Sequence, residues 1–291
     1  MRALRRLVRG LVLPVTARVV TVLLLTAWVA CASAIAGDAS PAAPDRRSGN
    51  AFLPEELRAL QADPTRNPLE LWIERGRQSW HSVDASASQT RSCQSCHGAA
   101  DAVTASSTAP AVRSAAAHFP RLSADGSRLL NLEDQIRACR VRSGLPDRPA
   151  ESDEVLALSA WLHHLARGEP IAVSAPPDAA LRTQWQAHLE RGTRAWTQRI
   201  GRYNLACVHC HDQNVGRSFR ADVTSPAHPT GFPVYRLSWA RPGSIDRRLR
   251  ACFSGVQAEM PAPGEPLLRE LELYLKVRAT GLPLDGPSLR R

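Results

Sequence analysis

Two Cys-x-x-Cys-His pentapeptides constrain the fold of this chain more than any other feature. The first spans Cys93–His97 and reads Cys-Gln-Ser-Cys-His, and the second spans Cys207–His211 and reads Cys-Val-His-Cys-His. This spacing is typical of c-type haem attachment, in which two cysteines form thioethers with one porphyrin and the adjacent histidine binds its iron. The two motifs therefore predict two covalently attached haem c groups, each a large apolar disc around which a few helices can pack.

The motifs assign a role to six residues. The cysteines that we expect to anchor the porphyrins are Cys93, Cys96, Cys207 and Cys210. The histidines that we expect on the proximal side of the iron are His97 and His211. Because haem is joined to such cysteines outside the bacterial cytoplasm, the motifs also predict a periplasmic protein.

The sequence around the motifs is repeated at an almost constant offset. Residues 74–76 (Glu-Arg-Gly) return as residues 190–192, and residues 135–139 (Gln-Ile-Arg-Ala-Cys) return as residues 248–252 (Arg-Leu-Arg-Ala-Cys). Cys207 follows Cys93 by 114 residues, in agreement with these pairs. The repeat predicts two tandem copies of one small domain of ~100 residues.

Helical periodicity dominates both copies, so we expect a mainly α fold of two tandem cytochrome c-like domains. The expected helices lie over residues 70–80, 132–140, 153–166, 181–200, 245–257 and 265–279. Only residues 234–237 suggest a strand, as part of one short pair. We place the first domain over residues 59–170, a linker over residues 171–180 and the second domain over residues 181–291.

The N-terminus has the pattern of a secretory signal peptide over residues 1–36. Arginines precede an apolar stretch at residues 19–30, and Ala34-Ile35-Ala36 offers a cleavage site between small residues. The apolar stretch is shorter than the ~20 residues that a membrane span needs. A retained membrane anchor and a lipid-modified Cys31 are therefore the weaker alternatives. Residues 37–58 are expected to form a flexible lead-in.

The net charge of +10 overstates the charge of the mature protein. The signal peptide holds five arginines and no acidic residue, so its removal halves the excess of positive charge. Two haems would bring four propionates, which offset most of what is left. We therefore expect no nucleic-acid partner and no membrane span after cleavage, whereas a basic face near one haem stays possible.

Two cysteines lie outside the motifs and the signal peptide, namely Cys139 and Cys252. They occupy equivalent positions in the repeat. A disulfide between them is possible in an oxidising compartment, but it gives no reason for equivalent placement. One sulfur ligand per haem does give that reason, so we expect Cys139 opposite His97 and Cys252 opposite His211. Met260, the one methionine of the mature chain, cannot serve two haems, and the remaining histidines lack partners in register.

Cys252 has the surroundings of a reactive thiol. Arg248 lies four residues earlier, on the same face of a helix. A guanidinium lowers the pKa of a nearby thiol and also binds oxyanions. For the neighbouring arginines, a solvated helix face is an equally good interpretation. The residue four positions before Cys139 is Gln135, so we expect a catalytic second site and a structural first site.

At these positions the sequence resembles the SoxA family, one subunit of the SoxAX cytochromes of bacterial thiosulfate oxidation. The resemblance covers residues 60–291. It is clearest at residues 204–214 around the second haem motif, at residues 228–237, and at residues 247–252 before and at Cys252. The chain departs from the family at Glu259-Met260-Pro261, where Glu-Pro is expected.

The resemblance implies an L-cysteine S-thiosulfotransferase, which joins thiosulfate oxidatively to a cysteine of the SoxYZ carrier protein. Cys252 would be the haem-bound sulfur, commonly found as a persulfide in this family, and Arg248 would bind the sulfonate end of thiosulfate. Electrons would pass through the second haem to SoxX, the monohaem subunit of a heterodimer, and then to a small soluble cytochrome. Two alternatives stay open: a dihaem electron-transfer cytochrome and a stand-alone thiosulfate dehydrogenase.

Overall fold

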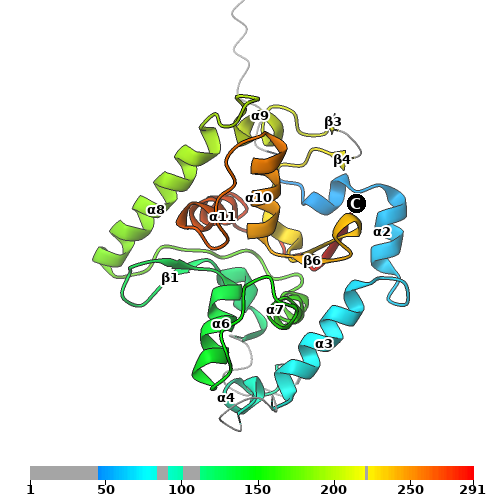
Figure 1. Ribbon diagram of the computed structural model, residues 1–291, viewed down its shortest axis with the longest axis vertical. Coiled ribbons are helices and arrows are strands. Elements are labelled where there is room, and N and C mark those ends of the chain that lie inside the picture. The colour runs from blue at the N-terminus through cyan, green and yellow to red at the C-terminus, as the bar shows by residue number, and fades with distance from the viewer. Residues whose placement is uncertain (1–44, 84–90, 101–111, 220–221) are drawn as a thin grey trace, which may run out of the picture. The chain divides into compact units, whose positions relative to one another are not determined.

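The structure of the protein is a computed structural model that describes residues 45–83, 91–100, 112–219 and 222–291 (Figure 1). The expected signal peptide, Cys31 and the first part of the expected lead-in lie outside the described residues. We call residues 59–170 the first half and residues 181–291 the second half.

The first half is organised around two helices that pack against each other, α3 (Leu69–His81) and α7 (Asp153–Leu165). Gly76 allows their close approach, because a Cβ at this position would lie 2.0 Å from the carbonyl oxygen of Ala157. The short haem-motif helix α4 (Cys93–His97) contacts α3, and α6 (Leu132–Arg142), which carries Cys139, contacts α7.

The second half repeats this arrangement with α8 (Ala179–Thr197) and α11 (Pro266–Arg278) as the packed pair. Gly192 is the residue at their contact, where a Cβ would lie 2.2 Å from the carbonyl oxygen of Glu270. The second haem motif forms α9 (Cys207–His211), and α10 (Ile245–Gly255) carries Cys252. The repeated Glu-Arg-Gly sequence therefore places its glycine at the same kind of helix contact twice.

All six expected helices are present, and their ends differ from the expected ends by at most three residues. Four of them begin at a side chain that accepts a hydrogen bond from the first turn: Asn131, Ser152, Asp178 and Ser244. The mainly α class is thus confirmed. Within the described ranges, no helix is both long enough and apolar enough to cross a bilayer.

The expected pair of short strands involving residues 234–237 is present as β5 (Val234–Arg236) and β6 (Arg241–Gly243), but the described residues contain further strands that were not expected. The described residues contain two hairpins, β1 (Arg121–Leu122) with β2 (Leu129–Leu130) and β3 (Ser218–Phe219) with β4 (Asp222–Val223). They also contain a sheet in which β5 lies antiparallel to β6 and parallel to β7 (Ser288–Arg290). Each strand has two or three residues, which is too short for an alternating pattern to emerge.

The remaining elements are short. They are α2 (Glu55–Ala62) and the 3-10 helices η1 (Gly49–Phe52), η2 (Ala115–His118), η3 (Pro229–Gly231) and η4 (Leu237–Trp239). One apolar core runs through both halves, since Leu158 and Trp161 of α7 belong to the same buried cluster as Leu273 of α11 and Leu289 of β7.

Residues of the expected lead-in and of the expected linker are packed against the second half. In the lead-in, the Asp45 carbonyl accepts a hydrogen bond from His228 Nε2 at 2.8 Å, and Asn50 Oδ1 accepts one from Arg290 Nη1 at 2.8 Å. In the linker, Ile171 is buried and its backbone exchanges hydrogen bonds with residues 281–282. Their amino-acid composition is that of loops, so only the tertiary contacts distinguish them from free segments.

Candidate functional site

Cys252 lies in the last turns of α10, next to the histidine of the second haem motif. Its side chain and that of His211 are hydrogen-bonding partners. The two motif cysteines lie near the same sulfur: after burial, the charge of Cys252 is the next effect that raises the pKa of the Cys207 and Cys210 thiols. The structure thus brings together the four residues that we expected around the second haem.

Several contacts orient His211. Its Nδ1 donates a hydrogen bond to the Ser225 carbonyl oxygen at 2.7 Å, so Nε2 is the nitrogen that could hold a metal ion. The ring of Trp196 lies against the imidazole, with the ring centroids 5.8 Å apart. Trp196 donates in turn to Asp212 Oδ2 at 3.0 Å, and Arg278 pairs with the same carboxylate. The imidazole is therefore held from two sides.

Opposing effects set the pKa of the Cys252 thiol. Burial raises this pKa, whereas the positive charge of Arg248, the hydrogen bond with His211 and the charge of Arg236 lower it, with a net value of about 7. Arg248 is the arginine of α10 that acts most strongly on this sulfur, as its position one helical turn earlier predicts.

The other arginines near Arg248 in sequence are held by different partners. Arg247 lies over the Trp239 ring at 4.3 Å from the ring centroid, and Arg250 donates to the Pro261 carbonyl oxygen at 2.9 Å. Arg241 donates to the Glu151 carbonyl oxygen at 2.7 Å. These three arginines thus make structural contacts, whereas Arg248 acts on the Cys252 sulfur.

Two arginines that the sequence analysis did not single out add positive charge to this region. Arg236 lowers the pKa of Cys252, and Arg290 interacts with Arg236 and Arg248. Arg236 of β5 and Arg290 of β7 are neighbours in the parallel strand pair. Burial, together with repulsion from Arg236 and Arg248, lowers the pKa of Arg290 to about 10. Arg236 lies within the segment that resembles the SoxA family and could have been found there, whereas Arg290 carries no sequence signal.

The first site has the same plan with different donors. His97 is a hydrogen-bonding partner of Cys139, and the Trp80 ring lies 5.7 Å from the His97 ring. The Cys139 sulfur also accepts hydrogen bonds from Gln135 Nε2 at 3.2 Å and from Arg142 Nη2 at 3.0 Å. Burial raises the pKa of the Cys139 thiol, and these three hydrogen bonds lower it to about 7. Gln135 thus occupies the place that Arg248 has in the second half.

The alternatives for the two cysteines find no support in the described residues. All six described cysteines are free, so no disulfide joins Cys139 to Cys252. Met260 is half exposed. Among the loose histidines, His118 contacts the Ala172 carbonyl oxygen at 3.3 Å and His163 contacts the Ser159 carbonyl oxygen at 2.9 Å.

The donors in each half fit a covalently bound haem c group. Each half presents two thiols on one short helix, which suits two thioether bonds, together with an imidazole nitrogen and a cysteine sulfur that lie close together. Histidine and cysteine are both established iron ligands of haem proteins. The expected ligand pairs are thus His97 with Cys139 and His211 with Cys252.

Known proteins are similar to this chain in sequence and in fold. Residues 75–171 match the family model described as SoxA/TsdA, cytochrome c domain. The L-cysteine S-thiosulfotransferase subunit SoxA of Pseudaminobacter salicylatoxidans is 34% identical over 84% of this chain and 80% of its own length. The subunit of the same name from Rhodovulum sulfidophilum is 30% identical over the same shares. The crystal structure of SoxXA from P. pantotrophus matches with a TM-score of 0.73 and 27% identity, over 84% of this chain and 86% of that one.

A mainly helical fold around Cys-x-x-Cys-His motifs defines a c-type cytochrome with covalently bound haem. The sequence identity to the two SoxA relatives extends over most of this chain and most of each relative, so the particular family of c-type cytochromes can be stated. The chain belongs to the SoxA family.

Proposed function

We propose that this protein is a haem-dependent L-cysteine S-thiosulfotransferase, which conjugates thiosulfate to a cysteine of the SoxYZ carrier protein. The observation that carries the proposal is that Cys252 lies beside both His211 and Arg248. An iron ligand and an anion-binding group thereby meet at one sulfur. The curated relatives carry the name of this activity.

The proposed reaction is oxidative. Thiosulfate and the carrier thiol form a new sulfur–sulfur bond, the carrier S–H bond breaks, and the product is a carrier Cys–S–S–SO₃⁻ group. One proton and two electrons are released. When bound, haem supplies the capacity to take up electrons one at a time next to sulfur.

The residues of the second site bind and orient the substrate. Arg248 donates hydrogen bonds to the sulfonate oxygens, since a guanidinium matches such oxyanions and carries the opposite charge. Arg236 and Arg290 add to the positive potential that attracts the dianion. The lowered pKa keeps a large share of the Cys252 sulfur in the thiolate form that binds metal ions.

We further propose that each half holds one haem c, with the first domain over residues 59–170 and the second over residues 181–291. The repeated glycine contacts and the repeated Trp–His ring contacts support two equivalent sites. The intact mass of the protein isolated from the periplasm would count the haems, report removal of residues 1–36 and reveal an extra sulfur atom on Cys252.

We also propose that electrons leave through a SoxX subunit in a heterodimer and then reach a small soluble cytochrome. The solved relative is a SoxXA complex, and the chain matches most of the chain compared there. A dihaem electron relay without substrate would have no need of a cation at Cys252. A stand-alone thiosulfate dehydrogenase would need neither carrier nor partner and would release tetrathionate, so product analysis separates it from the proposed enzyme.

Replacement of Cys252 tests the proposal. We expect Cys252→Ala to abolish thiosulfate oxidation that depends on the carrier while both haems stay attached, because the thioether cysteines are unchanged. Cys139→Ala is the matched control, and it should retain more activity because the first site lacks an equivalent of Arg248. The assay measures acceptor-cytochrome reduction with SoxX, thiosulfate and SoxYZ, alongside haem content. Full activity of Cys252→Ala would refute the proposed function.

A further inference from the structure

Arg269 of α11 connects the two helices that carry Cys139 and Cys252. Its side chain is almost fully buried, with 4% of its surface exposed. Its Nε and Nη2 atoms donate to the two carboxylate oxygens of Asp134 in α6, at 2.7 and 3.2 Å. Its Nη1 atom donates to Asp246 Oδ1 in α10, at 2.5 Å. One guanidinium therefore joins both helices.

Both carboxylates sit in the first turn of their helix, where they also satisfy backbone groups. Asp134 forms a capping box with Asn131, and Asp246 Oδ2 accepts a hydrogen bond from the Gly264 amide at 2.8 Å. The capping box ties Asp134 to the start of α6, whereas the Gly264 contact ties Asp246, in the first turn of α10, to the loop before α11. A shift of Arg269 is therefore transmitted to the backbone of α6 and α10.

The connection does not depend on Arg269 alone. Asn131, at the start of α6, donates to Glu272 Oε2 of α11 at 3.2 Å. Glu272 lies one turn after Arg269, so α11 contacts the start of α6 at two successive turns. Burial lowers the pKa of Arg269, but Asp134 and the other nearby carboxylates raise it by a larger amount. The guanidinium therefore keeps its charge.

We infer that Arg269 is a positioning residue that fixes the two cysteine-bearing helices relative to each other and thereby couples the sulfur positions at the two candidate haem sites. Cys139 follows Asp134 by five residues and Cys252 follows Asp246 by six, roughly 7 to 9 Å along a helix. This inference rests on the proposed function, in which both sulfurs are iron ligands.

The test compares Arg269→Met, Arg269→Lys and the control Arg191→Met in the haem-loaded protein. Arg191 also pairs with a carboxylate of α11, Glu270, and its other contact is His188. The measurements are the electron paramagnetic resonance spectrum and the midpoint potential of each haem. Arg269→Met should change the spectra and potentials of both haems. Arg269→Lys should restore them only in part, because an ammonium keeps the positive charge but lacks the planar set of donors that reaches both carboxylates. Arg191→Met should leave both haems unchanged.

Two isosteric variants keep the test valid if Arg269→Met does not fold. Asp134→Asn should perturb the first haem more than the second, and Asp246→Asn should do the reverse. Unchanged spectra and potentials in a folded Arg269→Met, or in both Asn variants, would overturn the inference. A wild-type spectrum without thiolate-ligated haem would instead refute the ligand assignment in the proposed function, so the two failures are distinct.

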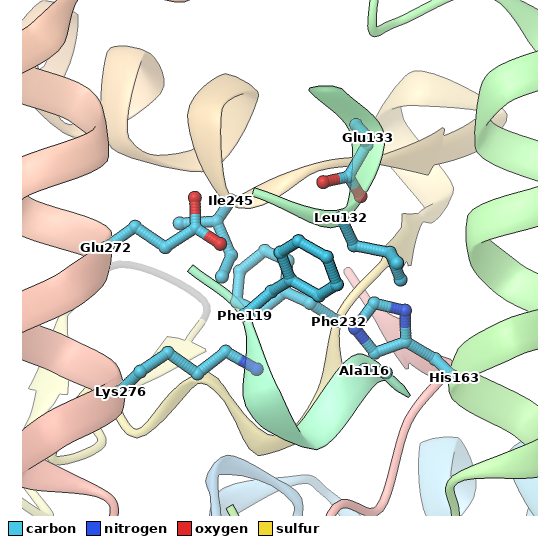
Figure 2. Close-up of a pocket in the computed structure, with 9 residues that line it drawn as sticks. All are labelled: Ala116, Phe119, Leu132, Glu133, His163, Phe232, Ile245, Glu272 and Lys276. Carbon is cyan, nitrogen blue, oxygen red and sulfur yellow. The ribbon is translucent and has the colours of Figure 1, made fainter. Parts of the chain in front are cut away.

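A separate observation concerns a small chamber beside α11, between elements of both halves (Figure 2). Its volume is about 10 Å³, and it is lined by Ala116, Phe119, Leu132, Glu133, His163, Phe232, Ile245, Glu272 and Lys276. Figure 2 shows Lys276 and Glu272 on one wall, His163 on the opposite wall, and the rings of Phe119 and Phe232 between them.

Lys276 is the unusual residue of this chamber. Only 1% of its surface is exposed, and its Nζ atom has no hydrogen-bond partner among the described residues. Burial lowers the pKa of Lys276, and the charges of Glu272 and Glu133 oppose this shift in part. Both carboxyl groups therefore lie near the amine, although neither forms a hydrogen bond with it. His163 adds no charge, because burial and Lys276 lower its pKa to about 3.

We propose that one water molecule occupies the chamber, accepts a hydrogen bond from Lys276 Nζ and donates to the Glu272 and Glu133 carboxyl groups. The volume suits one water, and the site offers the polar partners that a buried water needs. A bridging water also explains how a buried amine and buried carboxyl groups coexist without a direct ion pair.

Crystal structures of the haem-loaded wild type and of Lys276→Met test this proposal. The wild type should show electron density in the chamber at ~2.7–3.2 Å from Nζ, and Lys276→Met should lack this density. An empty chamber in the wild type, or a direct contact between Nζ and either carboxyl group, would overturn the proposal. The wild-type structure decides the question by itself if the variant does not fold.

Discussion

Cys139 and Cys252 have a similarly lowered thiol pKa for different physical reasons. At Cys139 the hydrogen bonds of His97, Gln135 and Arg142 offset the rise in pKa that burial causes. The Arg142 guanidinium donates its hydrogen bond directly to the Cys139 sulfur. At Cys252 the charge of Arg248 is the largest effect that opposes burial. Because Arg248 acts on the Cys252 sulfur through its charge, its N–H groups stay available to bind a substrate anion. This difference supports catalysis at the second site and a structural role for the first.

Arg248→Gln converts the second site to the polar pattern of the first. We expect the KM for thiosulfate to rise by roughly 10- to 100-fold, since a hydrogen bond to a charged group contributes about 1.5–3 kcal/mol. The absorption spectrum should change less than the KM, because His211 and Cys252 stay in place. Arg250→Gln is the control, since Arg250 is held by the Pro261 carbonyl. An altered spectrum with unaltered kinetics would contradict the assignment.

His163 should make the protein sensitive to acid. Burial, and then the charge of Lys276, lowers its pKa from 6.5 to about 3. The unfolded chain therefore binds one more proton than the folded protein between these pH values. Stability should fall as the pH falls through this window, by at most about 1.4 kcal/mol per pH unit.

Chemical denaturation of the holoprotein at several pH values measures this effect. Glu133 lies nearby and its pKa is raised by burial, so the wild-type slope also contains its contribution. The comparison of wild type with His163→Gln isolates the histidine, and the variant should lose less stability on acidification. His118→Gln, at an exposed histidine, should keep the wild-type slope. Parallel slopes for wild type and His163→Gln would disprove the prediction.

At the scale of elements, two helix pairs form the frame on which both candidate haem sites are built. The pair α3 and α7 and the pair α8 and α11 each meet at a glycine with no room for a side chain. The Trp residue that contacts the motif histidine lies four residues after that glycine in each half, Trp80 after Gly76 and Trp196 after Gly192. The helix contact therefore sets the position of the ring that supports the histidine.

Gly76→Ala and Gly192→Ala should each destabilise the protein by about 1–3 kcal/mol, because the added methyl group forces the helices apart. Gly255→Ala is a matched control, since a Cβ there meets no atom within 4 Å. The control should be neutral or slightly stabilising, because alanine favours helix over glycine. Denaturant unfolding of the holoprotein measures all three. An unchanged midpoint for both contact glycines would show that the helices are not held at this distance.

The helix positions could be read from the sequence because their apolar spacing and N-caps are local signals. Among the strands only β5 was expected, since β7 joins it across a separation of more than fifty residues and each strand is very short. The same reason explains why Arg236 entered only through a family resemblance and why Arg290 was missed.

At the scale of the whole molecule, the two halves are repeats but share one apolar core. Leu273 and Leu289 pack into the same cluster as Leu158 and Trp161 of the first half. Asp134 of the first half is the partner of buried Arg269 in the second. Residues 45–50 also contact the second half, through His228 and Arg290. These contacts join the halves into one compact unit.

We therefore expect residues 181–291, secreted alone, not to yield a stable holo-cytochrome. Separation would expose the shared core and remove Asp134, one of the two carboxylates that pair with Arg269, while Asp246 remains. The yield of covalent haem and the protease resistance of the fragment measure the outcome, with both halves secreted together as the control. A stable, haem-loaded fragment would show that the second half folds independently.

The sequence by itself determined the haem motifs, the equivalent placement of Cys139 and Cys252, and the position of Arg248, because these depend on residue types at short, fixed spacings. Only the tertiary structure decided which other groups surround Cys252 and how the cysteine-bearing helices are joined. Arg290 and Arg269 act through partners far away in the chain. No local pattern records such a partner, since the contact exists only once the chain has folded.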